Sequence, residues 1–183
     1  MSGLVGDNTA RASGVIAAAG GGTILQVKSL AFTGTATRSG STPAQISSFD
    51  MSFAATESDS KLYFQAFMDI GASDSVQTAL YFYDVTNSTI IGAYGDAAGS
   101  RLRVSWKRQV DHQGDDNATS FGCWHEPGTT TSRDYTIFGA GQTSYTLIIN
   151  RNNYNYDSAD IDSARAASTF TITEYAADKV TLT

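Results

Sequence analysis

A thiol, an imidazole and a carboxylate stand close together in the segment CWHEP, at residues 123–127. Cys123 and His125 could pair as nucleophile and base, or share a metal ion with Glu126. The two residues are two positions apart in a predicted strand and therefore share one of its faces. The chain has no second cysteine, and its other histidine, His112, is not spaced to complete a zinc set. We interpret the segment as a strand that enters a Pro-Gly turn, and we predict no catalytic residue and no enzyme activity.

Two groups of aspartates could offer oxygen ligands to calcium. They are Asp111, Asp115 and Asp116 in VDHQGDDNAT, and Asp157, Asp160 and Asp162 in NYDSADIDSA. Neither group has the alternating ligands, central glycine and final glutamate of an EF-hand loop. Aspartates of this kind commonly bond to backbone N–H groups in solvated loops, so we predict no metal site. The glycine-rich stretches also lack the Lys-Ser/Thr helix start of a phosphate loop, and we predict no cofactor.

The aromatic residues are the more informative candidates for binding. Tyr154 and Tyr156 stand among asparagines and an aspartate in NNYNYD, and flat rings beside such groups can stack on sugars and bond to their hydroxyls. We therefore treat Tyr154 and Tyr156 as candidate contacts to a host glycan receptor. The alternative is that both tyrosines lie at a subunit contact, while Trp106 and Trp124 fill the core.

The composition limits the classes of protein that fit the chain. Only 16% of its 183 residues are charged, and the net charge is −6. An acidic chain with scattered basic residues is a poor match to phosphates, which argues against a nucleic-acid partner. We expect no membrane insertion, because no run approaches the roughly 20 apolar residues needed for a bilayer span. The first residues also lack the pattern of a secretory signal.

The pattern of apolar residues is that of an all-β protein. Short alternating segments are separated by Gly, Ser, Asn and Asp clusters, and both prolines fall between them. Many short strands at regular spacing predict an antiparallel two-sheet sandwich of jelly-roll type. The predicted strands cover residues 24–33, 46–53, 61–70, 76–85, 89–94, 101–110, 119–125, 133–138, 145–150 and 168–175.

Residues 1–22 differ from the rest of the chain. They have no apolar period and end in the glycine triplet Gly20–Gly22, which predicts an extended N-terminal arm before a β-sandwich head at residues 23–183. The arm could equally be a terminus with no role. Its apolar side chains could instead dock on a partner, and the candidate anchoring residues are Leu4, Val5, Val15 and Ile16.

Two strand faces suggest contacts between copies of the chain. In the strand at 168–175, Phe170 and Ile172 fall on one face, and Thr171, Thr173 and Tyr175 on the other, where they could form a moderately polar subunit contact. Other strands carry bulky residues on both faces. The second face of these strands has more aromatic area than a monomer is expected to expose, from Tyr63, Phe67, Tyr81 and Tyr83.

Several segments resemble the virion appendage proteins of tailed bacteriophages of the marine and cyanobacterial type. They are SGLVGDNTARASGVIA at the start, TILQV in the first strand, Ile91-Gly92 with GDAAGSRLRVS in the middle, and INRNNYNYDSADIDSARAASTFTITEYAA near the end. The resemblance implies a small jelly-roll head, similar to those of the tumour-necrosis-factor and C1q group, assembled as a homotrimer. The chain departs from this family in lacking a long fibrous shaft and in carrying CWHEPG.

The resemblance implies a virion protein, made in the cytoplasm of a bacterial host. We expect a short tail or baseplate fibre-like appendage that contacts other virion proteins through its arm and contributes to host attachment. The alternative is a capsid decoration or cement protein with no receptor. A glycan-degrading enzyme is a third alternative, which would need two carboxylates facing each other across a cleft.

Overall fold

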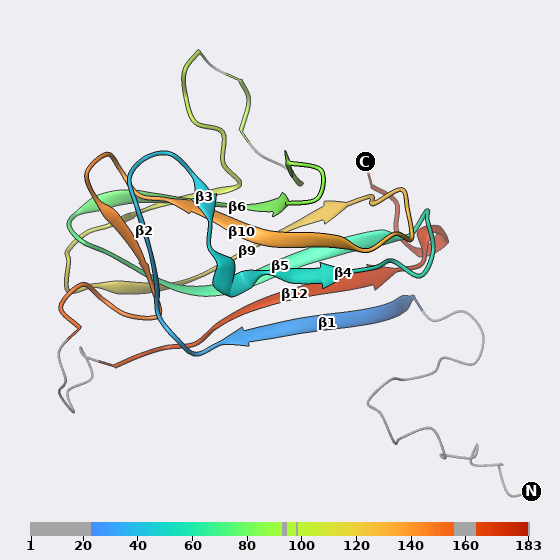
Figure 1. The fold of residues 1–183 in the computed structure, drawn as a ribbon, viewed down its shortest axis with the longest axis horizontal. Coiled ribbons are helices and arrows are strands. Elements are labelled where there is room, and N and C mark those ends of the chain that lie inside the picture. The colour runs from blue at the N-terminus through green and yellow to red at the C-terminus, as the bar shows by residue number, and fades with distance from the viewer. Residues whose placement is uncertain (1–22, 93–94, 98, 156–163, 183) are drawn as a thin grey trace, which may run out of the picture.

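The computed structural model describes residues 23–92, 95–97, 99–155 and 164–182 (Figure 1). The strands form two sheets, and the described residues also include two short 3-10 helices, η1 (Ser47–Phe49) and η3 (Ala177–Lys179). Sheet A contains β1 (Ile24–Phe32), β2 (Ala36–Ser39), β5 (Lys61–Ala72), β9 (Asp116–His125), β11 (Thr146–Ile149) and β12 (Ser168–Tyr175). Sheet B contains β3 (Ala44–Gln45), β4 (Met51–Phe53), β6 (Val76–Asp84), β7 (Thr89–Ile90), β8 (Trp106–Val110) and β10 (Arg133–Ala140).

The longest strand, β5, organises sheet A. One of its edges pairs with β9, and its other edge pairs first with β12 and then, near its end, with β11. β1 lies beyond β12, and β2 lies beyond β11. Sheet B is arranged in the same way around the pair β10 and β6, with β3 and β4 on one side and β7 and β8 on the other. All these pairs are antiparallel.

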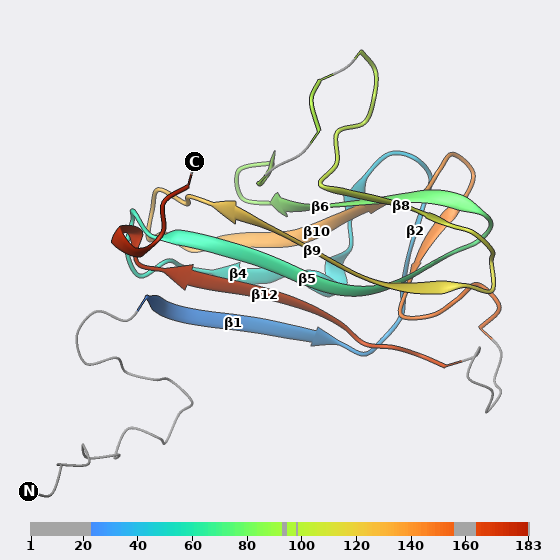
Figure 2. The same ribbon diagram turned by 180° about the vertical axis from the view of Figure 1, so that it is seen from behind.

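The order of the strands is that of a jelly roll. The chain passes from sheet A to sheet B and back repeatedly, so that strands next to each other in sequence often lie in opposite layers (Figures 1 and 2). Each sheet has four strand positions, and the two sheets enclose a main core and a smaller apolar cluster of Ala72, Val76 and Val110. The predicted fold class, an all-β antiparallel two-sheet sandwich of jelly-roll type, is confirmed. The predicted arm, with Leu4, Val5, Val15 and Ile16, lies outside the described residues.

Side chains alternate between the two faces of each strand, and those that point toward the other sheet form the core. In β5, Leu62, Phe64, Ala66 and Met68 point toward sheet B and are almost completely buried. Phe82 of β6 and Phe170 of β12 stack with their ring centroids 5.6 Å apart, which joins the two layers. Burial of such large aromatic and aliphatic side chains supplies most of the favourable free energy of folding.

The structure corrects several predicted strand boundaries. Residues 46–53 do not form one strand, because η1 interrupts them and turns Phe49 into the core. The strand predicted at 89–94 ends at Ile90, and the one predicted at 101–110 starts at Trp106. The short polar strand β2 was not predicted. None of the described segments is a helix of the length and apolarity that a bilayer span requires.

Candidate functional site

The outer face of sheet A, the side turned away from sheet B, is a broad surface without charge at its centre. We define this outer face of sheet A by the residues that the register places side by side in three rows across β1, β12, β5 and β9. The rows are Val27, Thr173, Tyr63 and Trp124; Ser29, Thr171, Gln65 and Gly122; and Ala31, Thr169, Phe67 and Ser120. None of these residues is charged.

Large apolar side chains on this face are exposed to an unusual degree. Val27 is 57% exposed and Phe67 is 55% exposed, although both lie in regular strands. The predicted contact residues Thr171, Thr173 and Tyr175 are half-buried on the same side of β12. The hydroxyl groups of Ser29 and Thr171 share one hydrogen bond of 2.8 Å. The face therefore combines apolar area with internally paired polar groups, as subunit contacts often do.

Three aromatic rings form a cluster at one end of the outer face of sheet A. Trp124 contacts Tyr63 at 4.9 Å and Tyr175 at 5.2 Å between ring centroids. Tyr63 can lie across β9 because its diagonal neighbour there is Gly122, where a Cβ would stand 2.5 Å from the Tyr63 hydroxyl. Trp124 therefore belongs to this outer cluster, and only Trp106 packs against the core.

Cys123 and His125 share a face of β9, as predicted, but it is the face that points into the core. They pair in register with Phe64 and Leu62, while Glu126 is exposed and forms an ion pair with Lys61 at 2.6 Å. Burial raises the pKa of Cys123 to about 12, so its thiol is protonated at neutral pH. A protonated, buried thiol is a poor nucleophile.

His125 lies in the core beside Tyr135 and Phe64. Burial lowers its pKa, with a contribution from Arg133, and Asp84 and Glu126 oppose this effect. Its Nε2 atom is buried and has no hydrogen-bond partner among the described residues. These surroundings keep the ring neutral and away from solvent, so we interpret it as a core residue.

Of the two candidate receptor tyrosines, the described part of the chain includes only Tyr154. Its ring packs edge-on against His112, and its hydroxyl lies 3.5 Å from His112 Nε2. The backbone N–H of Asn153 donates to Gln113 O, which ties the loop after β11 to the loop before β9. Tyr154 is therefore partly engaged by its own protein. Tyr156, with Asp157, Asp160 and Asp162, lies outside the described residues.

The aspartates of the other cluster lie between the end of β8 and the first residue of β9. Asp111, Asp115 and Asp116 are all exposed, and no set of three acidic, histidine or cysteine side chains among the described residues is placed to hold a metal ion. Sequence reasoning missed Asp69, which points outward from β5 toward Asp116 and is only 9% exposed. Burial, followed by the charge of Asp116, raises the pKa of Asp69 to about 6. The sequence signal that could have identified Asp69 is that it is the single acidic residue in a strand rich in aromatic and apolar residues.

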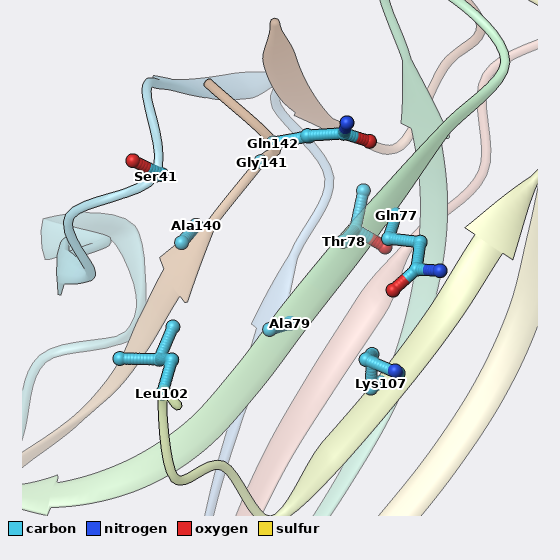
Figure 3. A pocket seen from close by; sticks show the side chains of 9 residues that line it. All are labelled: Ser41, Gln77, Thr78, Ala79, Leu102, Lys107, Ala140, Gly141 and Gln142. Carbon is cyan, nitrogen blue, oxygen red and sulfur yellow. The ribbon is translucent and has the colours of Figure 1, made fainter. Parts of the chain in front are cut away.

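On the opposite side of the molecule, a shallow groove crosses the outer face of sheet B (Figure 3). Its volume is about 360 Å³, and its floor is formed by Ala79 of β6 and Ala140 of β10. Leu102, which is 51% exposed, lines it from the segment that leads into β8, and Lys107 lines it from β8 itself. Gln77 and Gln142 add amide groups that can donate and accept hydrogen bonds.

Three aromatic rings lie next to this groove, on the outer face of β6 and β10. Phe138 of β10 contacts Tyr83 at 4.1 Å and Tyr81 at 5.6 Å between ring centroids. A second open depression adjoins Tyr81, bordered by Pro43, Ile90, Arg101 and Arg103. Tyr81 is only 7% exposed, so the expectation that this face exposes Tyr81 is wrong, whereas Phe67 on sheet A is exposed as expected.

No protein-family model matches the chain, and no curated protein sequence matches it. Two solved structures show a distant likeness. The VP2 subviral particle of infectious bursal disease virus has a TM-score of 0.39 and 13% identity, and a structure of the Gx strain of that virus has a TM-score of 0.40 and 11% identity. Both cover 82% of this chain, which spans only 37% and 38% of the viral chains. These values are too low to assign a family or a function.

Proposed function

We propose that this protein is a structural subunit of a tailed-bacteriophage virion, and that its jelly-roll head self-associates as a homotrimer through the outer face of sheet A. The resemblance of its sequence segments to phage appendage proteins supports the virion role. Jelly rolls are also a common architecture of viral capsid domains. This second argument is an analogy between folds and carries less weight than the surface of the molecule.

The observation that carries the proposal is the uncharged outer face of sheet A. A monomer in water gains nothing from exposing Val27 and Phe67 in the middle of regular strands. In contact with the same face of other copies, these side chains are removed from water, and no charge has to be desolvated with them. Thr171, Thr173 and Tyr175 then lie within or beside the contact.

A head that assembles through sheet A presents sheet B outward. The groove with Leu102 and the adjoining aromatic floor then face the surroundings of the particle. Rings beside amide and guanidinium groups suit a glycan, so we place host attachment here and not at Tyr154. Three heads on one trimer multiply weak contacts into useful avidity. In this proposal the arm, with Leu4, Val5, Val15 and Ile16, anchors the trimer to other virion proteins.

Replacing Val27 with lysine should convert the trimer into a monomer while the fold is retained. The new ammonium group would have to be buried without a partner within the contact, whereas in the monomer it stays in water. Sedimentation equilibrium gives the mass, and circular dichroism reports the fold. The control is Leu182→Lys, because Leu182 is an exposed apolar residue near the C-terminus, outside sheet A. A monomeric unmodified chain, or a Val27→Lys variant that stays trimeric, would contradict the proposed assembly.

Leu102→Asp should abolish binding of the trimer to host glycans, because it places a carboxylate in the apolar part of the sheet B groove. Binding of the labelled trimer to an array of bacterial surface glycans provides the measurement, and Leu182→Asp is the control of equal charge. If the unmodified trimer binds none of the glycans, the attachment role is wrong, and a capsid decoration or cement protein becomes the better interpretation.

A further inference from the structure

The outer side of sheet A carries a pair of carboxylates near the end of β5, beyond the uncharged rows. Asp69 pairs in register with Ala118 of β9, and Gly71 pairs with Asp116. Because paired residues share a side of the sheet, Asp69 and Asp116 both point outward and are diagonal neighbours. The charge of Asp116 adds to the effect of burial in raising the pKa of Asp69, as expected of neighbouring carboxylates.

Asp69 is in an unfavourable environment for an isolated carboxylate. It is 9% exposed, and its Oδ2 atom is buried without a hydrogen-bond partner in the described part of the chain. None of the three ion pairs found among the described residues includes Asp69 or Asp116. The two neighbouring acids therefore have no ion-pair partner in the part of the chain that the structure describes, an arrangement that costs free energy unless a proton or a metal ion joins them.

Two main-chain carbonyl oxygens lie beside Gly71, at the same end of β5 as Asp69. A Cβ placed on Gly71 would lie 2.5 Å from the carbonyl oxygen of Arg151 and 3.3 Å from that of Asp115. The absent side chain thus leaves room for both carbonyl groups beside Gly71, the residue that pairs in register with Asp116. The segment that contributes Arg151 is fixed by Asn152, which is 3% exposed, donates to Gly114 O at 3.0 Å and accepts from the N–H of Asn155 at 3.3 Å.

We propose that Asp69 and Asp116 bind a calcium ion on the outer side of sheet A, with the carbonyl oxygens of Asp115 and Arg151 as neighbouring ligands. All four groups offer oxygen, which is the ligand calcium takes, and calcium accepts carboxylates, carbonyls and water together in irregular geometry. Magnesium demands a stricter octahedron and gives up its water reluctantly, so a site made largely of main-chain carbonyls favours calcium.

The expected affinity is modest. Only two carboxylates contribute charge, and sites of this kind in extracellular modules have dissociation constants of about 10⁻⁴ to 10⁻³ M. The proposal is independent of the trimer, because Asp69 and Asp116 lie in one chain. An ion at this place would join β5, β9 and the segment after β11, and would stabilise the end of the sheet where their connections meet.

Calcium at about 10 mM should raise the melting temperature of the full chain by about 3 to 10 °C relative to EDTA at equal ionic strength. Isothermal titration calorimetry with calcium chloride should show one site per chain. Asp69→Asn and Asp116→Asn should each lose this shift. Asp69→Asn should also melt at a higher temperature than the unmodified chain in EDTA, because it removes a buried charge near another carboxylate.

The control is Asp59→Asn, which removes an exposed acid from the turn before β5 and should keep the full calcium response. Absence of both the heat and the shift in the unmodified chain would overturn the proposal and leave the pair joined by a proton only. A shift of equal size in all the variants would overturn it as well, because that result reflects general screening of charge. Since Asp116 is exposed, its variant keeps the test decisive if Asp69→Asn does not fold.

Discussion

Replacement of Phe64 by alanine is expected to lower the free energy of unfolding by about 3 to 5 kcal/mol. Phe64 is completely buried at the centre of the sandwich. Its ring contacts Tyr135 at 5.0 Å and Phe82 at 5.6 Å in sheet B, and Phe170 at 6.0 Å in sheet A. Removal of the ring therefore opens a cavity between the two layers, which rigid strands cannot close by collapsing.

Denaturant unfolding followed by tryptophan fluorescence provides the measurement, at protein concentrations below those of self-association. Phe67→Ala is the matched control, since it removes the same side chain from the same strand on the exposed side. Its effect on the free energy of unfolding should be within about 0.5 kcal/mol, as for other surface substitutions. Domains of this size are stable by about 5 to 15 kcal/mol, so the Phe64 variant should remain folded but close to its limit. Equal effects of the two substitutions would contradict the assignment of inner and outer faces.

Glu174→Ala is expected to cost about 3 kcal/mol, because it removes the charged acceptor that several partly buried hydrogen bonds share. The Glu174 carboxylate is fully buried within β12. It accepts hydrogen bonds from the side chain of Gln26 at 2.6 Å, and from the backbone N–H and the hydroxyl of Thr56 at 2.8 and 2.9 Å. It thus fastens β1 and the segment after β4 to the middle of sheet A. Denaturant unfolding of the two proteins at pH 7 measures the difference.

The pH dependence of stability provides an independent check on Glu174. Burial raises its pKa, but hydrogen bonds from Ser60, Gln26 and Thr56 outweigh this effect, and the pKa lies below its usual value. The ionised group therefore stabilises the fold fully above its unfolded pKa of about 4.3, and this contribution is lost as the pH falls through the lower folded pKa. The difference between the unmodified chain and Glu174→Ala should shrink below about pH 4. The control is Glu57→Gln, at an exposed glutamate in the same region, where the difference should be small at every pH.

Much of the architecture is predictable from the sequence, because the alternation of apolar and polar residues along a strand is a local property. The pattern of β5 gives its start at Lys61 and the two faces of the strand, and β12 matches its predicted bounds. The prediction fails where local pattern and tertiary packing disagree. Ile46 and Phe49 are both core residues, but they are three positions apart, and only the 3-10 turn η1 brings both inward.

The candidate sites depend on register, which a single sequence does not encode locally. Alternation alone groups Thr171, Thr173 and Tyr175, but the neighbours Val27 and Trp124 come from strands far away in the chain. The pair Asp69 and Asp116 could not be found for the same reason, since it exists only through the pairing of β5 with β9. The burial of Tyr81 depends on Phe138, which lies on another strand.

The junction of β11 and β12 has a consequence for how this protein can change over generations. The chain leaves β11 at Asn150 and re-enters the sheet at Ser168, and the Ser168 hydroxyl donates to the Asn150 side chain, which also bonds to the carbonyls of Phe32 and Gly34. This closure sets the register of both strands at the base of the connection. Lengthening a connection costs free energy only with the logarithm of its length. A lineage can therefore insert or delete residues between Asn155 and Ala164 while the register of β11 and β12 is inherited unchanged.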